Sequence, residues 1–477
     1  MKRTRYIFLA GALSLCASMA CSSAALAEDR RSASTAGYDA LDYDVSLEYK
    51  DNTRDMSGST TMKAKATEDL KDVSLDFAGG RVGKVTVDGR SAEFGIQGEK
   101  LKVKTRPLPK GSAFTVHVDY VVTRKNPDDP AHPGKQQHMP WLEADRGFII
   151  EPQSPGTAHR VYPCKDDVTD KATYTFHVTA PSDLTGIANG DLTSTKEVSG
   201  GATMRTYRLN HPVPAMDNQV AVGPYTQVNS HTRQDGVTVR DVVPTDQADR
   251  LKPLLTPRTD RQLDWLTSKL GRYPFKTYGT FASLVPAAFE SATLVTLPIP
   301  QQGNEFGDYL MAHEMTHQWF GASLTPKENF GDDLWLAEGH AHLYGLWYSS
   351  DPKDPGSEKA LEAAMREEYG IDQGIRNEEG APGKPGDFSK TGMTQRTGGA
   401  LALYALRQSV GPQTFEKIER AVADRYKYKT ISTEDYIKTA REVSGSEDAA
   451  KVLRNWLFST ETPPMPGHPD WKPGSAS

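Results

Sequence analysis

The first half of the chain alternates apolar and polar residues. Every second position is apolar over most of residues 43–49, 116–122 and 172–179. This period of two is typical of strands that bury one face. Breaks rich in glycine, asparagine and aspartate separate them, as at residues 188–191. The pattern over residues 38–227 predicts a β domain, a sandwich or saddle of antiparallel sheet.

The second half of the chain has the apolar spacing of helices. Residues 277–281 are strand-like, and the helices that we expect are residues 251–270, 306–321, 334–349, 357–369, 399–410 and 412–425. Residues 370–398 are rich in glycine, proline and charge and have no apolar period, which predicts a lid, a binding loop or a disordered segment. The fold class that follows is multidomain α+β, with an N-terminal antiparallel β domain and a mainly helical domain after it.

The N-terminus has the features of an export signal. Lys2, Arg3 and Arg5 form a basic start, a mostly apolar run follows, and small residues precede residue 28. The apolar run is too short to span a bilayer comfortably. We therefore expect a signal peptide at residues 1–27, a short linker at residues 28–37, and a secreted, extracellular protein without a membrane span.

The positions of the cysteines and the net charge indicate which disulfides, lipid anchors and binding partners to expect. Cys16 and Cys21 lie in the signal, so Cys164 is the one thiol of the mature chain, and no internal disulfide is expected. An alternative uses Cys21 as a lipid-modified residue at the cell surface, although Ser18 stands where an aliphatic residue is usual. Removing the signal takes away three cationic residues and no acids, so the net charge changes from −6 to −9. This acidity argues against nucleic acid or an anionic membrane as partner.

Residues 311–321 read MAHEMTHQWFG and contain the pattern H-E-x-x-H. His313 and His317 are four positions apart, so on a helix they face the same side one turn apart. Two imidazoles so placed can enter one zinc coordination sphere, and Glu314 can serve as the general base. The alternative is a solvated helix with two incidental histidines, which only a third ligand would dismiss.

A candidate third ligand interrupts the apolar residues 334–342, LWLAEGHAH. Burying the Glu338 carboxylate there is costly unless a cation pairs with it, and zinc would do so. Three protein ligands would leave one open position for water. Glu338 could otherwise be an exposed helix residue. His342 shares its helix face and is the main rival ligand, whereas His340 points elsewhere and is expected to pack or to face the substrate.

These motifs resemble the aminopeptidase N family of gluzincin zinc metallopeptidases, which includes the leukotriene hydrolase branch. HEMTHQWFG followed by DLWLAEG is similar to the family's pattern. The gap from His317 to Glu338 is two residues longer than usual, in a connecting loop where length is well tolerated. Residues 161–174, VYPCKDDVTDKATY, resemble the signature of the family's N-terminal β domain, and residues 399–407 resemble the helix after the active site.

The resemblance implies a fold, a cofactor and an activity. We expect an N-terminal β domain at residues 38–230, a thermolysin-like, mainly helical zinc peptidase domain at residues 231–463, and a loose Pro-rich tail at residues 464–477. Cys164 is then a buried structural thiol. The implied protein is a zinc-dependent aminopeptidase with one zinc ion per chain, acting on peptides with a free N-terminus.

The segment AAFES at residues 287–291, followed by LVT, resembles the family segment that binds the substrate's amino terminus. By that match Glu290, with Ala288, would hold the free ammonium group, for which a carboxylate is the suitable partner. Without the match, Glu290 would be an ordinary acid at a strand edge. A third alternative, an endopeptidase, would accept peptides whose N-terminus is blocked.

Two departures from the family pattern concern catalysis. Where the family has a tyrosine that donates to the oxyanion, this chain has Arg396, and losing one such donor typically costs about 10²–10³ in turnover. Arg396 is a candidate oxyanion substitute, or else a solvated lid residue; Tyr404 is expected in the core. Gly345 stands where members often carry a glutamate that orients a ligand, whose loss lowers metal affinity about 10–100-fold. The alternative function is a catalytically weakened zinc- and peptide-binding homologue.

Overall fold

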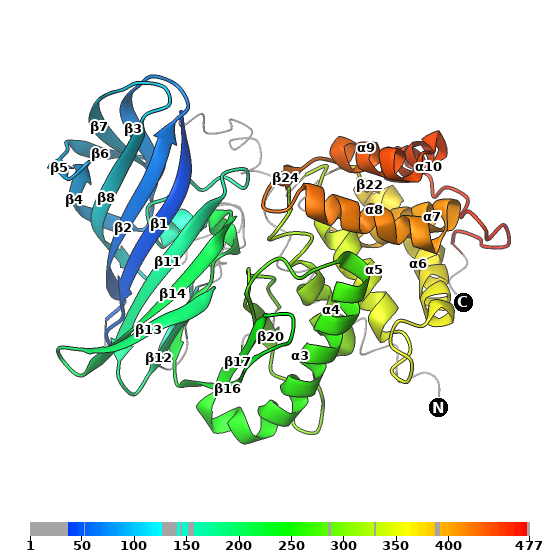
Figure 1. Ribbon diagram of the computed structural model, residues 1–477, viewed down its shortest axis with the longest axis horizontal. Helices are drawn as coiled ribbons and strands as arrows, with labels where there is room; N and C mark the ends of the chain where they lie inside the picture. Colours follow the sequence, from blue (N-terminus) through cyan, green and yellow to red (C-terminus); the bar gives the residue numbers. More distant parts are fainter. Residues whose placement is uncertain are drawn as a thin grey trace.

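The computed structural model describes residues 37–51, 53–125, 141–143, 146–150, 157–284, 288–328, 331–386 and 392–474. The predicted signal peptide at residues 1–27, with Cys21, lies outside the described residues, as does nearly all of the predicted linker. A β-rich part precedes a mainly helical part, and the two lie side by side (Figure 1). This arrangement confirms the predicted fold class.

The strands of the N-terminal part form one long sheet and two shorter ones. Its strands are β1 (Tyr38–Glu48), β2 (Asp55–Ala66), β3 (Leu70–Asp76), β4 (Gly80–Val87), β5 (Arg90–Ser91), β6 (Phe94–Gln97), β7 (Lys100–Leu108), β8 (Ala113–Thr123), β9 (Trp141–Glu143), β10 (Phe148–Ile150), β11 (Ala172–Pro181), β12 (Thr185–Ala188), β13 (Asp191–Val198), β14 (Ala202–Val213) and β15 (Val220–Gly223). The long sheet has the order β13-β14-β11-β1-β2-β8-β4-β5, and the others are β12-β15-β10-β9 and β3-β7-β6.

The predicted alternation is visible in the strands themselves. Side chains of β11 are alternately buried and half-buried along its whole length. β1 pairs with β11 in parallel and with β2 antiparallel, so Tyr43 lies beside Tyr174 and their rings stack at 5.2 Å. Cys164 is buried and carries a free thiol, as expected. One buried face per strand is therefore what the sequence pattern encodes.

The second part begins with a small sheet and continues in helices. Its strands are β16 (Tyr225–Thr232), β17 (Thr238–Pro244), β18 (Thr277–Tyr278), β19 (Thr280–Ser283), β20 (Val295–Pro298), β21 (Thr325–Pro326), β22 (Gly380–Ala381), β23 (Lys384–Pro385) and β24 (Thr430–Ile431). Its helices are α3 (Ala248–Leu270), α4 (Asp308–Thr316), α5 (Trp335–Ser349), α6 (Glu358–Glu379), α7 (Gly399–Val410), α8 (Pro412–Arg425), α9 (Thr433–Ser444) and α10 (Glu447–Phe458), with a π-helical turn, η4 (Thr394–Gly398), directly before α7. The sheet has the order β16-β17-β19-β20, so residue 230, the expected domain boundary, falls inside β16.

The expected irregular stretch at residues 370–398 is wrong over its first ten residues, where α6 continues to Glu379. The charges that suggested a loop pair with each other inside the fold. Arg376 donates from Nε to Asp372 at 2.6 Å, and both side chains are fully buried. Arg376 also donates to the backbone carbonyls of Trp456 and Ser459, which ties α6 to the end of α10.

The Pro-rich tail, expected to be loose, packs against the helices. Trp471 is buried and its ring lies parallel to that of Tyr404 at 6.0 Å. Met465 is buried too. Tyr404 is a core residue, as expected. Aromatic and thioether side chains therefore hold this segment in place despite its prolines.

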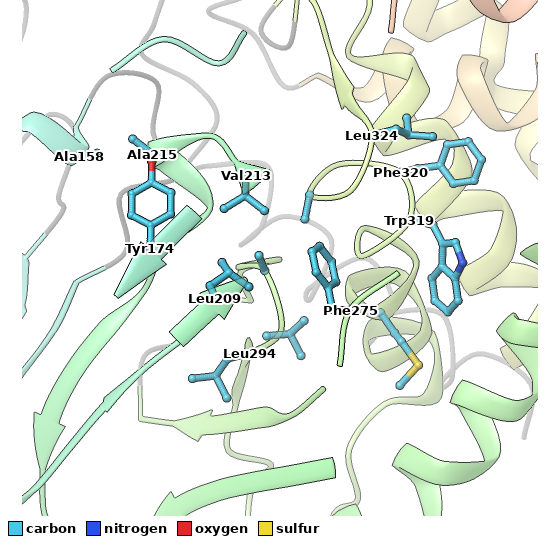
Figure 2. Packing of buried hydrophobic residues seen from close by; sticks show 14 of the residues in the cluster. Ala158, Tyr174, Leu209, Val213, Ala215, Phe275, Leu294, Trp319, Phe320 and Leu324 are labelled. Atoms are coloured by element: carbon cyan, nitrogen blue, oxygen red, sulfur yellow. The ribbon is translucent and has the colours of Figure 1, made fainter. Parts of the chain in front are cut away.

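One hydrophobic core passes through both parts of the molecule. Figure 2 shows Leu209 and Val213 of β14 on one side of this junction and Phe275, Trp319 and Phe320 on the other. The apolar contact extends from the β part to the segment that follows α4.

A polar contact crosses the same junction. Lys171, directly before β11, donates from Nζ to the carbonyls of Ala322 at 3.2 Å and Ser323 at 2.7 Å. Both acceptors lie a few residues after His317. The β part thus supports the backbone next to the H-E-x-x-H motif. Among the described residues, no helix is both long enough and apolar enough to span a membrane.

Candidate metal centre

Two packed helices bring His313, His317 and Glu338 together. His313 lies in α4, His317 directly follows its last residue, and Glu338 lies in the first turn of α5. The Nε2 atoms of the two histidines are 3.3 Å apart. Oε2 of Glu338 lies 3.6 Å from Nε2 of His313, and Oε1 lies 3.7 Å from Nε2 of His317. One ligand atom from each residue lies within 4.8 Å of the others.

These distances fit a zinc ion. Zn–N distances of about 2.0–2.1 Å and Zn–O distances of about 2.0–2.2 Å in a tetrahedron require about 3.3–3.5 Å between ligand atoms. The observed separations of 3.3, 3.6 and 3.7 Å are close to that range. Two imidazoles and one carboxylate are also the ligand set of zinc hydrolases, which keep the fourth position open. The residues present therefore fit zinc.

The protonation of both imidazoles suits metal binding. Nδ1 of His317 lies 3.1 Å from the carbonyl oxygen of Phe320, which can only accept a hydrogen bond. The proton therefore sits on Nδ1, and Nε2 keeps its lone pair for the metal. Burial lowers the pKa of His313 well below its ordinary value, and the nearby charge of Arg396 acts in the same direction. His313 is thus held neutral, which is the form that binds a metal.

The expected general base and amino-terminus group lie in the same electrostatic neighbourhood. Glu314 is buried next to His313 in α4, with 5% of its surface exposed. Burial raises the pKa of Glu290, the charge of His317 lowers it, and the charge of Glu338 raises it. Ala288 is half-buried two positions before Glu290, and Phe289 between them forms an isolated β-bridge with Thr296 of β20.

Arg396 lies among these groups in the π-helical turn η4. Its Nε is 3.5 Å from Oε2 of Glu338, and its side chain is 14% exposed. The Arg396 side chain is thus largely enclosed beside the Glu338 carboxylate rather than solvated. The Arg396 guanidinium therefore lies next to the three proposed metal ligands. In the sequence motif compared above, the family has a tyrosine at this position. Single π-helical turns inside helices are frequent at functional sites.

His340 and His342, the two histidines that follow Glu338 in α5, contact groups other than the proposed metal ligands. Among the described residues, the group that could hold a metal does not include His342. Nδ1 of His342 lies 2.7 Å from the hydroxyl of Tyr309, and its Nε2 lies 3.3 Å from Oε2 of Glu368. His340 stacks on Phe320 with ring centroids 3.7 Å apart, so it packs.

Sequence reasoning missed Tyr309 and Glu368. Tyr309 lies four positions before His313 on α4, so its place on the same helix face was readable from the sequence. Glu368 comes from α6, thirty residues beyond Glu338, and no local pattern links it to the site. Only the packing of α6 against α5 brings it there.

A β part joined to a helical part that carries H-E-x-x-H and a distal glutamate defines a zinc-dependent metallopeptidase. Comparisons with known proteins agree with this class. Residues 39–215 match the Peptidase M1 N-terminal domain, and residues 301–456 match the Peptidase family M1 domain. The two matches together cover more than half of the sequence. The chain belongs to the peptidase M1 family.

The similar proteins have low sequence identity to this chain, and a solved structure among them has the same fold. The chain is 23% identical over 342 residues to Aminopeptidase M1 of Arabidopsis thaliana, covering 65% of this chain and 37% of that protein. It is 22% identical over 462 residues to Leukotriene A-4 hydrolase of Xenopus laevis, covering 87% and 70%. The crystal structure of an M1 zinc metallopeptidase from Deinococcus radiodurans superposes with a TM-score of 0.77 at 25% identity, covering 92% of this chain and 97% of that one. The chain spans well under half the length of the Arabidopsis relative.

Proposed function

We propose that this protein is a zinc-dependent aminopeptidase that removes the N-terminal residue of peptides. The observation that carries the proposal is the convergence of His313, His317 and Glu338 on one point. Glu290 lies close enough to His317 and Glu338 to interact with both electrostatically. Related proteins named as aminopeptidases support it. Neither the described residues nor the comparisons favour the alternative of a catalytically weakened homologue.

The chemistry divides between the cofactor and the side chains. A bound zinc ion lowers the pKa of a coordinated water to about 7 and polarises the scissile carbonyl. Glu314, adjacent to a ligand and buried, accepts the proton of the attacking water and then passes it to the leaving amine. Because Glu314 is not one of the three ligands, its role is separable from metal binding.

Selection for a free N-terminus rests on Glu290. Burial raises the pKa of Glu290, and a carboxylate in such a position is a suitable partner for the ammonium group of a substrate. An acylated N-terminus carries no charge and cannot form this ion pair. Ala288 lies two residues before Glu290 in the same segment, and we propose that it also contacts the substrate. Only the first peptide bond would then reach the metal.

Arg396 is the group that we propose for the oxyanion. Its guanidinium is permanently charged and lies beside Glu338, so it can stabilise the negative charge that develops on the carbonyl oxygen. Arg396→Met removes the charge and should lower kcat by about 10²–10³ without weakening zinc binding, because a cation near the site does not attract zinc. Arg396→Tyr restores a neutral donor and should retain more activity than Arg396→Met. Unchanged turnover in both variants would overturn this role.

Location remains a proposal from the sequence. The basic start, the apolar run and the small residues before residue 28 support export with cleavage of residues 1–27, and Cys21 offers lipid anchoring instead. Mass spectrometry of the mature protein distinguishes the two: cleavage after residue 27 supports release, and a lipidated Cys21 at the new N-terminus supports an anchor.

The decisive experiment uses paired substrates. Aminoacyl anilides with a free amino group should be hydrolysed, their N-acetylated counterparts should not, and a chelator should abolish turnover until zinc is returned. Glu290→Gln should raise KM for the free substrates more than it lowers kcat, since the ion pair acts in binding. Equal cleavage of acetylated peptides would favour an endopeptidase, and cleavage by metal-free protein would overturn the proposal.

A further inference from the structure

A line of polar contacts leads away from the metal centre behind His313. The Tyr309 hydroxyl lies 3.3 Å from Nδ1 of His313 and 2.7 Å from Nδ1 of His342. On its other side, His342 places Nε2 3.3 Å from Oε2 of Glu368. Thr397 donates its hydroxyl to the same oxygen at 2.8 Å. The line therefore joins α4, α5, α6 and η4.

The position of each proton along this line of contacts can be deduced by starting from the Glu368 carboxylate. Burial alone would raise the pKa of Glu368, but the neighbouring His342 and the hydroxyl of Thr397 outweigh burial and lower it, so this carboxylate is ionised. An ionised carboxylate only accepts, so in a neutral His342 the proton belongs on Nε2, 3.3 Å from Glu368, and Nδ1 is the acceptor. Tyr309 then donates its O–H to His342, and its oxygen is free to accept from Nδ1–H of His313.

This order of donors has one consequence for the ligand. A proton held on Nδ1 of His313 leaves Nε2, the atom 3.3 Å from its counterpart in His317, with a lone pair. The same contact, together with a hydrogen bond between His313 and the backbone of Ala341, restrains the rotation of the ring. The Tyr309 hydroxyl touches the ring nitrogen opposite to Nε2, so it acts through the ligand and not on a substrate.

The position of Tyr309 also explains why residue 345 is a glycine. A Cβ atom added to Gly345 would lie 3.0 and 3.1 Å from two ring carbons of Tyr309 and 3.2 Å from its carbonyl oxygen. The Tyr309 ring thus occupies the space into which any side chain at residue 345 would extend. Glycine on α5 and tyrosine on α4 are complementary in shape at this point.

We propose that Tyr309, His342 and Glu368 form a positioning network that orients His313 for zinc, in place of a carboxylate at residue 345. The network rests on the proposed zinc site and not on the identity of the substrate. Tyr309, His342 and Glu368 are positioning residues, since the contacts above connect them to a ligand rather than to reacting atoms.

The test measures zinc binding apart from activity. Tyr309→Phe removes only the hydroxyl, and Glu368→Gln removes only the charge that sets the proton order. Each should weaken zinc binding about 10–100-fold in competition with a chromophoric chelator, as the loss of an outer hydrogen-bond partner does. The visible absorption spectrum of the cobalt-substituted protein should shift in both variants.

Tyr436→Phe is the matched control. Tyr436 is likewise a buried tyrosine whose hydroxyl donates to a buried carboxylate, Glu419, at 2.6 Å. It should leave zinc affinity and the cobalt spectrum unchanged. The unfolding temperature of each zinc-free variant separates orientation of the ligand from general loss of stability.

The outcomes are distinct. Weaker zinc binding in Tyr309→Phe and Glu368→Gln, but not in Tyr436→Phe, supports the network even if the wild-type protein cleaves no peptide, which would count against the proposed function alone. Wild-type zinc affinity and an unaltered cobalt spectrum in the first two variants would overturn the network, whatever their activity.

Discussion

A buried histidine in the β part should make stability depend on pH above neutrality. His159 lies in a short 3₁₀ helix, Ala158–Arg160, and is 4% exposed. Its Nδ1 lies 2.7 Å from Asp166, and its Nε2 lies 3.4 Å from Glu99. Burial lowers the pKa of His159, but the hydrogen bonds and charges of these two carboxylates outweigh it and raise the pKa from 6.5 to about 9.

The sign and size of the effect follow from linkage. Because the pKa in the folded protein is raised, the stabilisation is fully present below pH 6.5 and is lost as the pH rises through about 9. At 1.36 kcal/mol per pKa unit, the protonated imidazole contributes about 3 kcal/mol at pH 6.5, about 2 kcal/mol at pH 7.5 and less than about 1 kcal/mol at pH 8.5.

The assay compares His159→Gln with the wild-type protein by urea unfolding, followed by far-ultraviolet circular dichroism, from pH 6.5 to about pH 9.5. The difference in the free energy of unfolding should shrink by about 3 kcal/mol across this range, because glutamine carries no titrating charge. His211→Gln is the control: burial and the charges of Lys427 and Lys276 lower the pKa of His211, so its difference should stay flat.

A direct measurement can refute the reasoning. In isotope-labelled protein, the histidine resonance that disappears in His159→Gln should titrate near pH 9. Titration of that resonance near pH 6.5, or a free-energy difference independent of pH, would mean that Asp166 and Glu99 do not hold the proton on this imidazole.

Three further predictions concern the metal centre. Glu314→Gln should lower kcat about 10²–10⁴-fold and keep one zinc ion per chain by metal analysis, since it removes only the proton acceptor; loss of the metal would show instead that Glu314 is a ligand. Glu338→Ala should lose zinc in dialysis against a weak chelator, and zinc should no longer raise the unfolding temperature; retained zinc would exclude Glu338 from the ligand set. Gly345→Ala should weaken zinc binding by displacing Tyr309, whereas Gly374→Ala in α6, whose added Cβ meets nothing within 4 Å, should only stabilise the helix by about 1 kcal/mol.

The sequence predicted the parts of the site that are local. His313 and His317 share one helical turn, and Glu338 stands out because an acid in an apolar run needs a cation. The strands of the β part were predictable for the same reason, since each alternates on its own. Tyr309 obeys the same helical spacing as the histidines and could have been found.

What the sequence did not predict depends on tertiary contacts. The glycines and charges of residues 370–379 favour a loop locally, but the buried Asp372–Arg376 pair and its contacts with α10 hold them in a helix. Helix α9 was missed although its capping box, Ser432 with Asp435, was present in the sequence. The contact of Glu368 with His342 joins two helices through packing, which no local pattern specifies.

The two hydrogen bonds from Lys171 connect the structure of the helical part to that of the β part. Without that lysine, the carbonyls of Ala322 and Ser323 would lose their side-chain donor, and the turn after His317 would lose its contact with the β part. A helical half produced by itself would therefore carry all three metal ligands and still hold them loosely. Damage to the β half would therefore also disturb the metal centre in the helical half.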